Sequence, residues 1–412
     1  MQNLFEGLNE AQLQAVTHVS GPLLIVAGAG TGKTTVITRR IAYLLEQKLA
    51  RPEEILALTF TDKAAGEMEE RVDLLLPLGS YDLWISTFHS FCERILKQHG
   101  IDMGLSNNFQ LLDQTRQWIF VFQHFDAFKL DYYKPLGSPN KFIDALLDHF
   151  SKCKDELISP EDYLAYAENL KRGNGAVVEL PLDGESDTAV EIKRIEELAG
   201  AYQTYQRLLL ENEYLDFGDL IHYAIQLFRK RPNLLKYYQE QFKFIMVDEF
   251  QDTNIAQYEL IKLLTQRTSS SRVIPDATKG DPVSSLDSGF RRNDRQNNLV
   301  VVGDDDQSIY KFRGASVSNI LKIKENFPTI KNITLLDNYR STQPILDLAY
   351  NFIQANNPNR LETKLGINKQ LTGHATDKSH VQVLEGKDLS EELNLVVSKA
   401  LEAKNEFPDS SW

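Results

Sequence analysis

Six short apolar runs recur along the chain, and each is too continuous to be a strand with one face in water. Strands buried on both faces occur mainly in parallel sheets that helices cover on either side. The pattern therefore predicts one buried parallel sheet. The runs are 23–28, 55–60, 83–88, 242–249, 298–304 and 332–338.

Amphipathic helical patterns follow most of these runs, with apolar residues repeating every three to four positions. Two apolar sets each share one helical face: Val36, Ile37, Ile41, Leu44 and Leu45, then Ala65, Met68, Val72, Leu75 and Leu76. Strand followed by helix, repeated, predicts an α/β fold with a parallel sheet.

The pattern changes between the third and fourth runs. Residues 101–240 are rich in helical periodicity and aromatic side chains, and one polar stretch with glycines interrupts them at 171–187. We expect a mostly helical subdomain inserted into the sheet domain, with the chain returning near 215–221.

Composition narrows the class of protein. The 412 residues are 42% hydrophobic and 25% charged, as in ordinary globular proteins. Two cysteines, no secretory signal pattern and no membrane-length apolar run favour a cytoplasmic protein that does not enter membranes. A net charge of −13 argues against coating nucleic acid by charge alone, but it does not exclude a local groove with its own basic and aromatic lining.

A glycine-rich segment, AGAGTGKTT at 27–35, joins the first run to a helical pattern. Its glycines let backbone N–H groups turn toward phosphate oxygens, and a helix N-terminus adds its dipole. Lys33 would reach the outer phosphates and Thr34 would hold Mg²⁺. The alternative is a glycine-rich turn without a ligand. The expected nucleotide contacts are Ala27, Gly28, Ala29, Gly30, Thr31, Gly32, Lys33, Thr34 and Thr35.

Two adjacent acids end the fourth run, in FIMVDEFQDTN at 244–254. Asp248 would hold Mg²⁺, and Glu249 would be the general base for an attacking water. Taken alone, such a pair is as often a solvated turn. A phosphate loop on the same sheet favours the chemical interpretation.

Seven motifs together resemble the N-terminal part of superfamily 1 DNA helicases of the UvrD/Rep/PcrA type, in that family's order. The resemblance implies a RecA-like P-loop NTPase sheet, an inserted helical subdomain and the start of a second RecA-like domain. The motifs lie at 8–16, 27–35, 58–72, 86–92, 247–254, 301–315 and 336–342.

The resemblance assigns further roles around ATP. Gln12 would read the adenine edge and Tyr339 would stack on the adenine ring. Arg340 would act as an arginine finger on the γ-phosphate. Gln307 would contact the γ-phosphate or its attacking water. Without the other motifs, Gln12 would be an ordinary helix-surface residue.

The resemblance also implies contacts with single-stranded DNA, where aromatic rings stack on bases. Tyr310, Phe312 and Arg313 would face the strand beside Gln307; the alternative is that the two rings belong to a core. Further candidates are Phe60, Thr61 and His89, although a lone histidine is more often structural.

The expected organisation is a sheet domain split by the insertion, with part of a second domain after it. We expect a 3′–5′ DNA helicase that uses ATP and Mg²⁺ on single strands and single-strand/duplex junctions. Two later family motifs are absent before Trp412. One alternative is therefore a catalytically incomplete ATP- and DNA-binding fragment of a split or truncated helicase, with a separately encoded C-terminal half as a partner in the split case; another is an AddA-type helicase–nuclease. The expected segments are 1–105, 106–212, 213–330 with a low-complexity insertion at 269–297, and 331–412.

Overall fold

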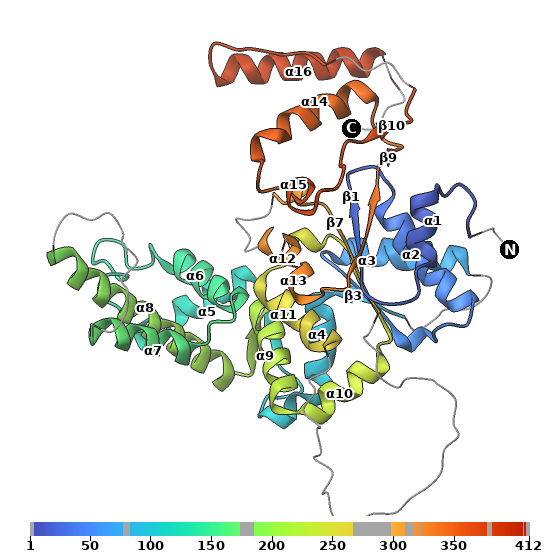
Figure 1. Ribbon diagram of the computed structural model, residues 1–412. Coiled ribbons are helices and arrows are strands. Elements are labelled where there is room, and N and C mark those ends of the chain that lie inside the picture. Colours follow the sequence, from blue (N-terminus) through green and yellow to red (C-terminus); the bar gives the residue numbers. More distant parts are fainter. Residues whose placement is uncertain are drawn as a thin grey trace, which may run out of the picture.

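A six-stranded parallel sheet forms the centre of the computed structural model, in the order β3-β2-β6-β7-β1-β8 (Figure 1). This confirms the predicted fold class. Each strand arises from one of the six apolar runs. The strands are β1 Leu23–Ala27, β2 Ile55–Thr59, β3 Trp84–Thr87, β6 Phe244–Val247, β7 Asn298–Gly303 and β8 Lys331–Leu335.

The structure describes residues 4–76, 83–173, 185–266, 298–309, 317–321, 323–376, 381–406 and 408. The predicted insertion at 269–297 and the DNA-contact candidates Tyr310, Phe312 and Arg313 lie outside these ranges.

Helices cover both faces of the sheet, because alternate strand residues point to opposite sides. Leu23 and Ile25 pack with α1, α2 and α3 on one face, and Leu24 and Val26 pack with α4, α9, α10 and α11 on the other. The helices are α1 Glu10–Thr17, α2 Lys33–Glu46, α3 Asp62–Leu75, α4 Phe88–His99, α9 Phe217–Lys230, α10 Pro232–Gln241, α11 Ile255–Thr265, α12 Val317–Leu321 and α13 Ile323–Asn326.

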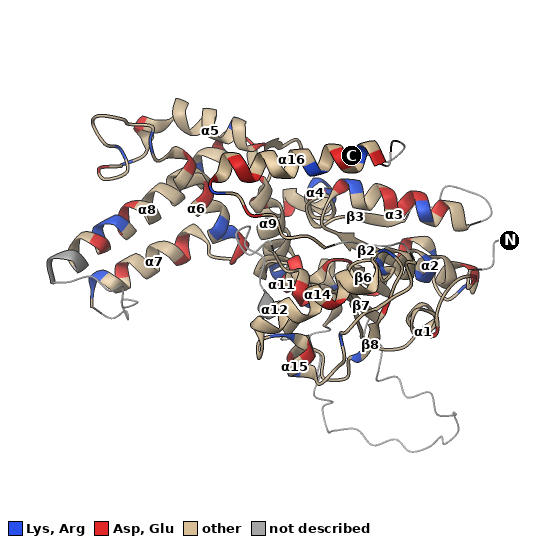
Figure 2. Ribbon diagram, turned by 90° about the horizontal axis from the view of Figure 1, so that it is seen from above, with Lys and Arg blue, Asp and Glu red and all other residues tan. Residues whose placement is uncertain are grey.

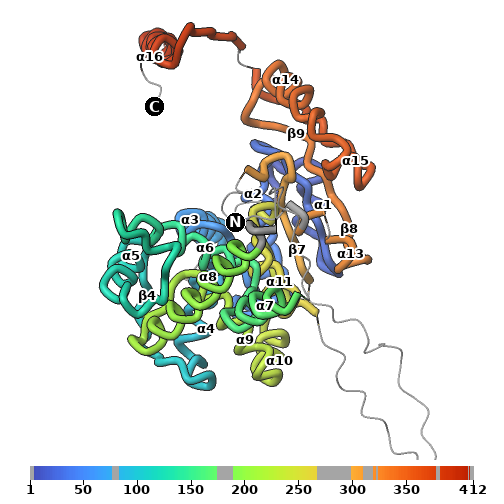
Figure 3. Tube along the Cα trace, turned by 90° about the vertical axis from the view of Figure 1, so that its left-hand side faces the viewer, coloured from blue at the N-terminus to red at the C-terminus, as the bar shows by residue number. Residues whose placement is uncertain are grey.

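The helical insertion is a separate packing unit with its own core, which includes Phe150, Tyr202 and Tyr205. Its helices lie to one side of the sheet domain in Figure 1, and in Figure 3 this side faces the viewer. A parallel pair of short strands, β4 Gln110–Leu112 and β5 Tyr214–Asp216, marks where the chain leaves and returns. The helices are α5 Gln114–Gln123, α6 Ile143–Asp155, α7 Pro160–Lys171 and α8 Glu185–Glu211.

A buried ion cluster ties this unit to the sheet domain. The Lys154 ammonium on α6 lies 2.6 Å from Asp216 and 2.8 Å from Asp219 at the start of α9. Charges of both signs are interspersed along α7 and α8 (Figure 2). The insertion is therefore attached through specific buried charges while its outer faces are polar.

The chain after β8 builds a smaller group of elements. The strand β8 pairs with β1, so residues 331–335 belong to the first sheet; the proposed start of a second domain at 331 otherwise stays a prediction. None of the described side chains of α16 is buried. The elements are β9 Asp337–Asn338, α14 Gln343–Ile353, α15 Leu361–Leu365, β10 Thr372–Gly373 and α16 Leu389–Glu406. Among the described residues, no helix is both long and apolar enough to cross a membrane.

Candidate nucleotide site

The loop between β1 and α2 depends on two glycines with left-handed backbone. Gly30 has φ 76° and Gly32 has φ 89°, values that residues with a side chain rarely adopt. A Cβ at Gly30 would lie 2.6 Å from Cβ of Arg340, and a Cβ at Gly32 would lie 2.8 Å from Nε2 of Gln12. Both glycines are therefore required by conformation and by space.

Donors from other segments hold the carbonyl groups of this loop. Asn338 Nδ2 donates to the Ala29 carbonyl at 2.6 Å, and the Tyr339 N–H donates to the Gly30 carbonyl at 3.0 Å. Gln12 Nε2 donates to the Thr31 carbonyl at 2.9 Å. With its carbonyls bonded to the protein, the loop keeps a defined shape.

The N-terminus of α2 has no side-chain cap, whereas Thr61, Thr87 and Asp113 cap α3, α4 and α5. The first N–H groups of a helix need an acceptor, and an anion supplies one. Lys33, Thr34 and Thr35 form this first turn. The geometry fits a phosphate group here, as the sequence predicts.

Three chemical groups meet at the carboxyl edge of the sheet. The buried Lys33 ammonium lies 2.6 Å from Glu249 Oε2 and 3.3 Å from Gln307 Oε1. Lys33 follows β1, while the other two follow β6 and β7. Parallel strands bring their carboxyl ends to one edge, so residues far apart in sequence converge. The Glu249 carboxylate satisfies the ammonium where a phosphate would.

Glu249 has a left-handed backbone, with φ 47° and ψ 43°, which is uncommon for a residue with a side chain. Gln251 supports it, since its Nε2 donates to Glu249 Oε2 at 2.9 Å and its Oε1 accepts from the Asp304 N–H at 3.0 Å. One buried amide thus links the β6 turn (residues 248–252) to the β7 turn (residues 304–307).

Asp248 is a buried carboxylate whose charge is poorly compensated. Burial, then the neighbouring Glu249 charge, raise the pKa of Asp248 to about 6, although the Lys33 charge opposes the shift. A bound divalent cation would reverse this preference for the neutral acid. Carboxylate and hydroxyl oxygens suit Mg²⁺, so Asp248 and the half-buried Thr34 fit such an ion.

Hydrogen-bond partners on both sides orient the Gln307 amide. Asp304 Oδ2 only accepts, and it receives a bond from Gln307 Nε2 at 2.6 Å. The Lys33 ammonium only donates, so it faces Oε1. The amide orientation, which is assigned from this network, presents a carbonyl oxygen to the phosphate loop.

The residues expected around the adenine and γ-phosphate lie close to the loop, with differences in detail. Gln12 uses both ends of its amide, because its Oε1 accepts from the Asn9 N–H at 3.1 Å while Nε2 holds Thr31. The half-exposed Tyr339 ring stacks on His374 with centroids 5.2 Å apart. Arg340 is exposed beside Gly30.

A cavity of about 380 Å³ opens beside the loop. Gly28, Ala29 and Gln307 line it on the sheet side, and Leu346 and Phe352 of α14 line it on the other. The phosphate loop therefore borders open space between the sheet edge and the C-terminal elements.

The DNA-contact candidates within the described residues follow β2 and β3. Phe60 is half-buried, and Thr61 caps α3 through the Ala64 N–H. The His89 ring packs edge-on against Phe217, with centroids 5.8 Å apart. Burial lowers the pKa of His89, although the Asp62 and Asp216 charges oppose the shift, so this ring is neutral near pH 7 and does not act as a cation.

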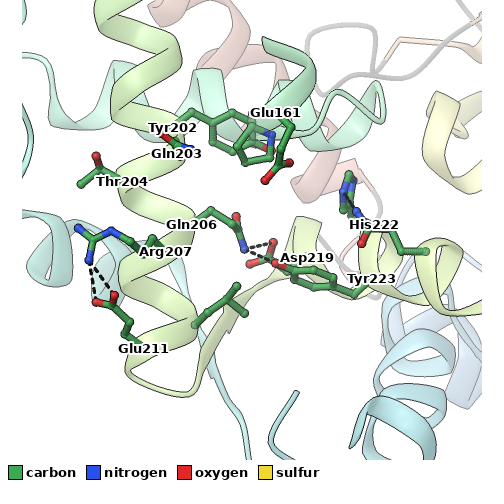
Figure 4. Close-up of a pocket in the computed structure, with 13 residues that line it drawn as sticks. Glu161, Tyr202, Gln203, Thr204, Gln206, Arg207, Glu211, Asp219, His222 and Tyr223 are labelled. Atoms are coloured by element: carbon green, nitrogen blue, oxygen red, sulfur yellow. Dashed lines mark hydrogen bonds and ion pairs between the residues drawn. The ribbon is translucent and has the colours of Figure 1, made fainter. Parts of the chain in front are cut away.

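A second cavity, of about 560 Å³, lies between α8 of the helical insertion and α9 of the sheet domain (Figure 4). Several of its polar groups are paired with one another, and His222 is neutral near pH 7. Arg207 pairs with Glu211 at 2.8 Å, Gln206 bonds Asp219 at 2.9 Å, and burial lowers the pKa of His222 to about 4. Size alone therefore does not identify a reactive site, and the smaller cavity, which Gly28, Ala29 and Gln307 line, is the chemical candidate.

Comparison with known proteins agrees with this geometry. A family model described as the UvrD/REP helicase N-terminal domain matches residues 8–328. The chain belongs to this family. The match covers the phosphate loop, the β6 and β7 turns and the helical insertion.

Several relatives of this UvrD/REP-type chain carry the description ATP-dependent DNA helicase PcrA. The Bacillus subtilis protein is 40% identical over 358 residues, which cover 87% of this chain and 40% of the relative. The Leuconostoc citreum protein is 36% identical over 386 residues, covering 92% and 44%. The Staphylococcus aureus protein is 40% identical over 356 residues, covering 86% and 41%. The chain thus spans about two fifths of the length of these relatives.

Several residues at the site were missed from sequence. Gln251 is in the acidic motif, but nothing in the motif alone shows that its amide joins two strands. The pairing of Asn9 with Gln12 could have been found, since Asn followed three residues later by Gln is a capping-box pattern. Asn338 lies in the motif at 336–342, but nothing in the motif shows its bond to Ala29. Arg360, Lys369 and His374 gave no local signal.

Proposed function

We propose that this chain binds ATP and Mg²⁺ and forms the nucleotide-hydrolysing part of a helicase that moves 3′ to 5′ along single-stranded DNA. The convergence of the Lys33 ammonium, the Glu249 carboxylate and the Gln307 amide carries the proposal. These groups lie beside an uncapped helix N-terminus, a combination suited to phosphoryl chemistry.

The geometry suggests a role for each group. Lys33 exchanges its bond to Glu249 for one to a phosphate oxygen, which leaves Glu249 free to accept a proton from water. The Gln307 carbonyl oxygen accepts a hydrogen bond from that water and orients it. Asp248 and Thr34 would hold Mg²⁺, which neutralises phosphate charge when bound. Arg340 and Tyr339 would complete the site at the γ-phosphate and the adenine.

The DNA-binding function is part of the same proposal. Phe60, Thr61 and His89 follow neighbouring strands and would line a path for single-stranded DNA or a junction, with Phe217 as an added exposed ring. Stacking on such rings tolerates any base sequence. Tyr310, Phe312 and Arg313 remain predictions from sequence, as do a cytoplasmic location and a separately encoded C-terminal half as partner.

Titration of the 412-residue chain with a fluorescent ATP analogue tests nucleotide binding. Lys33→Ala removes a charge-assisted bond to phosphate, worth about 1.5–3 kcal/mol, so affinity should fall ten- to a hundredfold. Lys236→Ala is the matched control, because Lys236 is exposed on α10 and its ion pair with Glu240 is long, at 3.9 Å. Equal affinity of wild type and Lys33→Ala would contradict the proposal.

A further inference from the structure

Three consecutive carboxylates after β7 would suit a metal ion by composition alone. Oxygen atoms of Asp304, Asp305 and Asp306 lie within 4.8 Å of one another. The Lys369 ammonium instead lies among them, donating to Asp304 at 2.5 Å and to Asp305 and Asp306 at 2.6 Å. All three N–H donors of the ammonium are used, so the protein supplies its own cation.

A second buried cation fixes the far side of the same turn. Arg360 Nε and Nη2 each donate to one oxygen of Asp306 at 2.7 Å, a bidentate pair of defined geometry. The Leu361 N–H donates to Asp305 Oδ2 at 2.7 Å. Although burial opposes it, the bonds from Arg360 and then Lys369 lower the pKa of Asp306, so this carboxylate is held in its charged form.

These contacts continue without a break to the phosphate loop. Lys369 bonds one oxygen of Asp304, and the other oxygen of Asp304 accepts from Gln307 Nε2. The remaining atom of that amide, Oε1, accepts from Lys33. The amide of Gln307 can rotate about its side-chain bonds unless both ends are held, so the state of Asp304 decides where its carbonyl oxygen points.

We propose that Lys369 and Arg360 are positioning residues for Gln307: they clamp the β7 turn so that its amide oxygen faces the reacting end of the nucleotide. The clamp comes from the chain after β9, whereas Gln307 belongs to the first sheet. The segment around 360–369 thus adjusts the phosphate site without touching it. This inference rests on the proposed function of that site.

Binding of ADP and of ADP–aluminium fluoride, which imitates the transferred phosphoryl group and its attacking water, tests the clamp. In Lys369→Met we expect the aluminium fluoride complex to weaken about tenfold while the Kd for ADP changes less than twofold. Lys369→Arg should recover part of the loss. Lys364→Met is the matched control, since Lys364 is exposed on α15. Equal weakening of both complexes, or of neither, would overturn the proposal.

A double-mutant cycle separates positioning from general support of the fold. If Lys369 acts through Gln307, Lys369→Met should cost almost nothing further in a Gln307→Ala background. Additive losses would show that Lys369 acts elsewhere and would overturn the inference.

Hydrogen exchange tests the clamp even without nucleotide. The Gln307 N–H bonds the Asp304 carbonyl and the Ser308 N–H bonds the Asp305 carbonyl, so both amides should exchange at least tenfold faster in Lys369→Met and in Arg360→Gln. Unchanged exchange would overturn the inference. Absence of any nucleotide binding by wild type would instead contradict the proposed function.

Discussion

Two acidic turns follow adjacent strands of the sheet, and the fold compensates their negative charges to different extents. In the β7 turn, Lys369 and Arg360 neutralise the carboxylates through bonds of 2.5–2.7 Å. In the β6 turn, Asp248 has no comparable cation among the described residues, and its pKa is raised to about 6. The β7 turn therefore needs no added cation, whereas the β6 turn favours one.

The difference separates a structural acid from a functional one. Buried carboxylates are costly unless paired, so a fold normally supplies partners, as Lys369 does. A buried acid left without a full partner stores an unfavourable free energy that a ligand can release. By composition alone, the three aspartates of the β7 turn would look like a better cation site than the Asp–Glu pair of the β6 turn.

The largest expected effect is on hydrolysis at the β6 turn. Glu249→Gln removes the proposed base, which should slow ATP hydrolysis about 10²–10⁴-fold. ATP affinity should stay the same or rise, because Lys33 no longer has to leave a carboxylate. Single-turnover hydrolysis and fluorescent-nucleotide titration measure the two quantities. Glu240→Gln, exposed on α10, is the control; parallel losses of binding and hydrolysis would argue against a base.

Stability should change in opposite directions at the two turns. Asp306→Asn leaves Arg360 and Lys369 short of a partner and should lower the free energy of unfolding by about 2–3 kcal/mol. Asp248→Asn removes an uncompensated buried charge and should raise it by about 1–2 kcal/mol at neutral pH. Urea denaturation in the absence of nucleotide and Mg²⁺ measures both changes in the free energy of unfolding. Two changes of the same sign would contradict the distinction between the turns.

The pH dependence sharpens that contrast. Because the folded-state pKa of Asp248 lies above its ordinary value of 3.8, at about 6, the unfolded chain releases this proton first as pH rises. The contribution of protonated Asp248 to the free energy of unfolding is fully present below about pH 4 and is lost as pH rises through about 6. The gain from Asp248→Asn should therefore be larger at pH 7.5 than at pH 5. A gain that is independent of pH would mean that Asp248 is not the titrating group.

The smallest effect concerns Gln12, which bonds the phosphate loop and which the sequence resemblance assigns to the adenine edge. If its main role is the bond to Thr31, Gln12→Ala should weaken ATP and GTP binding equally, by about 1 kcal/mol. If it reads the adenine edge, only ATP binding should weaken. Competition titrations with both nucleotides distinguish these results.

The sheet and the phosphate loop could be predicted from sequence because their causes are local. Strands buried on both faces must be continuously apolar, and the loop needs glycine where φ is positive, as at Gly30 and Gly32. The acids after β6 and β7 could be located for the same reason. Their placement at one edge follows from parallel pairing.

The partners of those acids could not be predicted, because they come from distant parts of the chain. Lys369 lies 65 positions from Asp304, in a stretch without periodicity or motif. A lysine there is indistinguishable from a surface charge until the fold buries it. The surroundings of Tyr339 could not be predicted either, since the sequence does not show that His374 stacks on its ring.

The most direct test of the contrast between the turns is the Mg²⁺ dependence of ATP binding, measured by calorimetry on wild type, Asp248→Asn and Asp306→Asn. We expect Mg²⁺ to tighten ATP binding at least tenfold in wild type and in Asp306→Asn, and less than threefold in Asp248→Asn. A full Mg²⁺ effect in Asp248→Asn, or its loss in Asp306→Asn, would contradict the assignment of the cation site to the β6 turn.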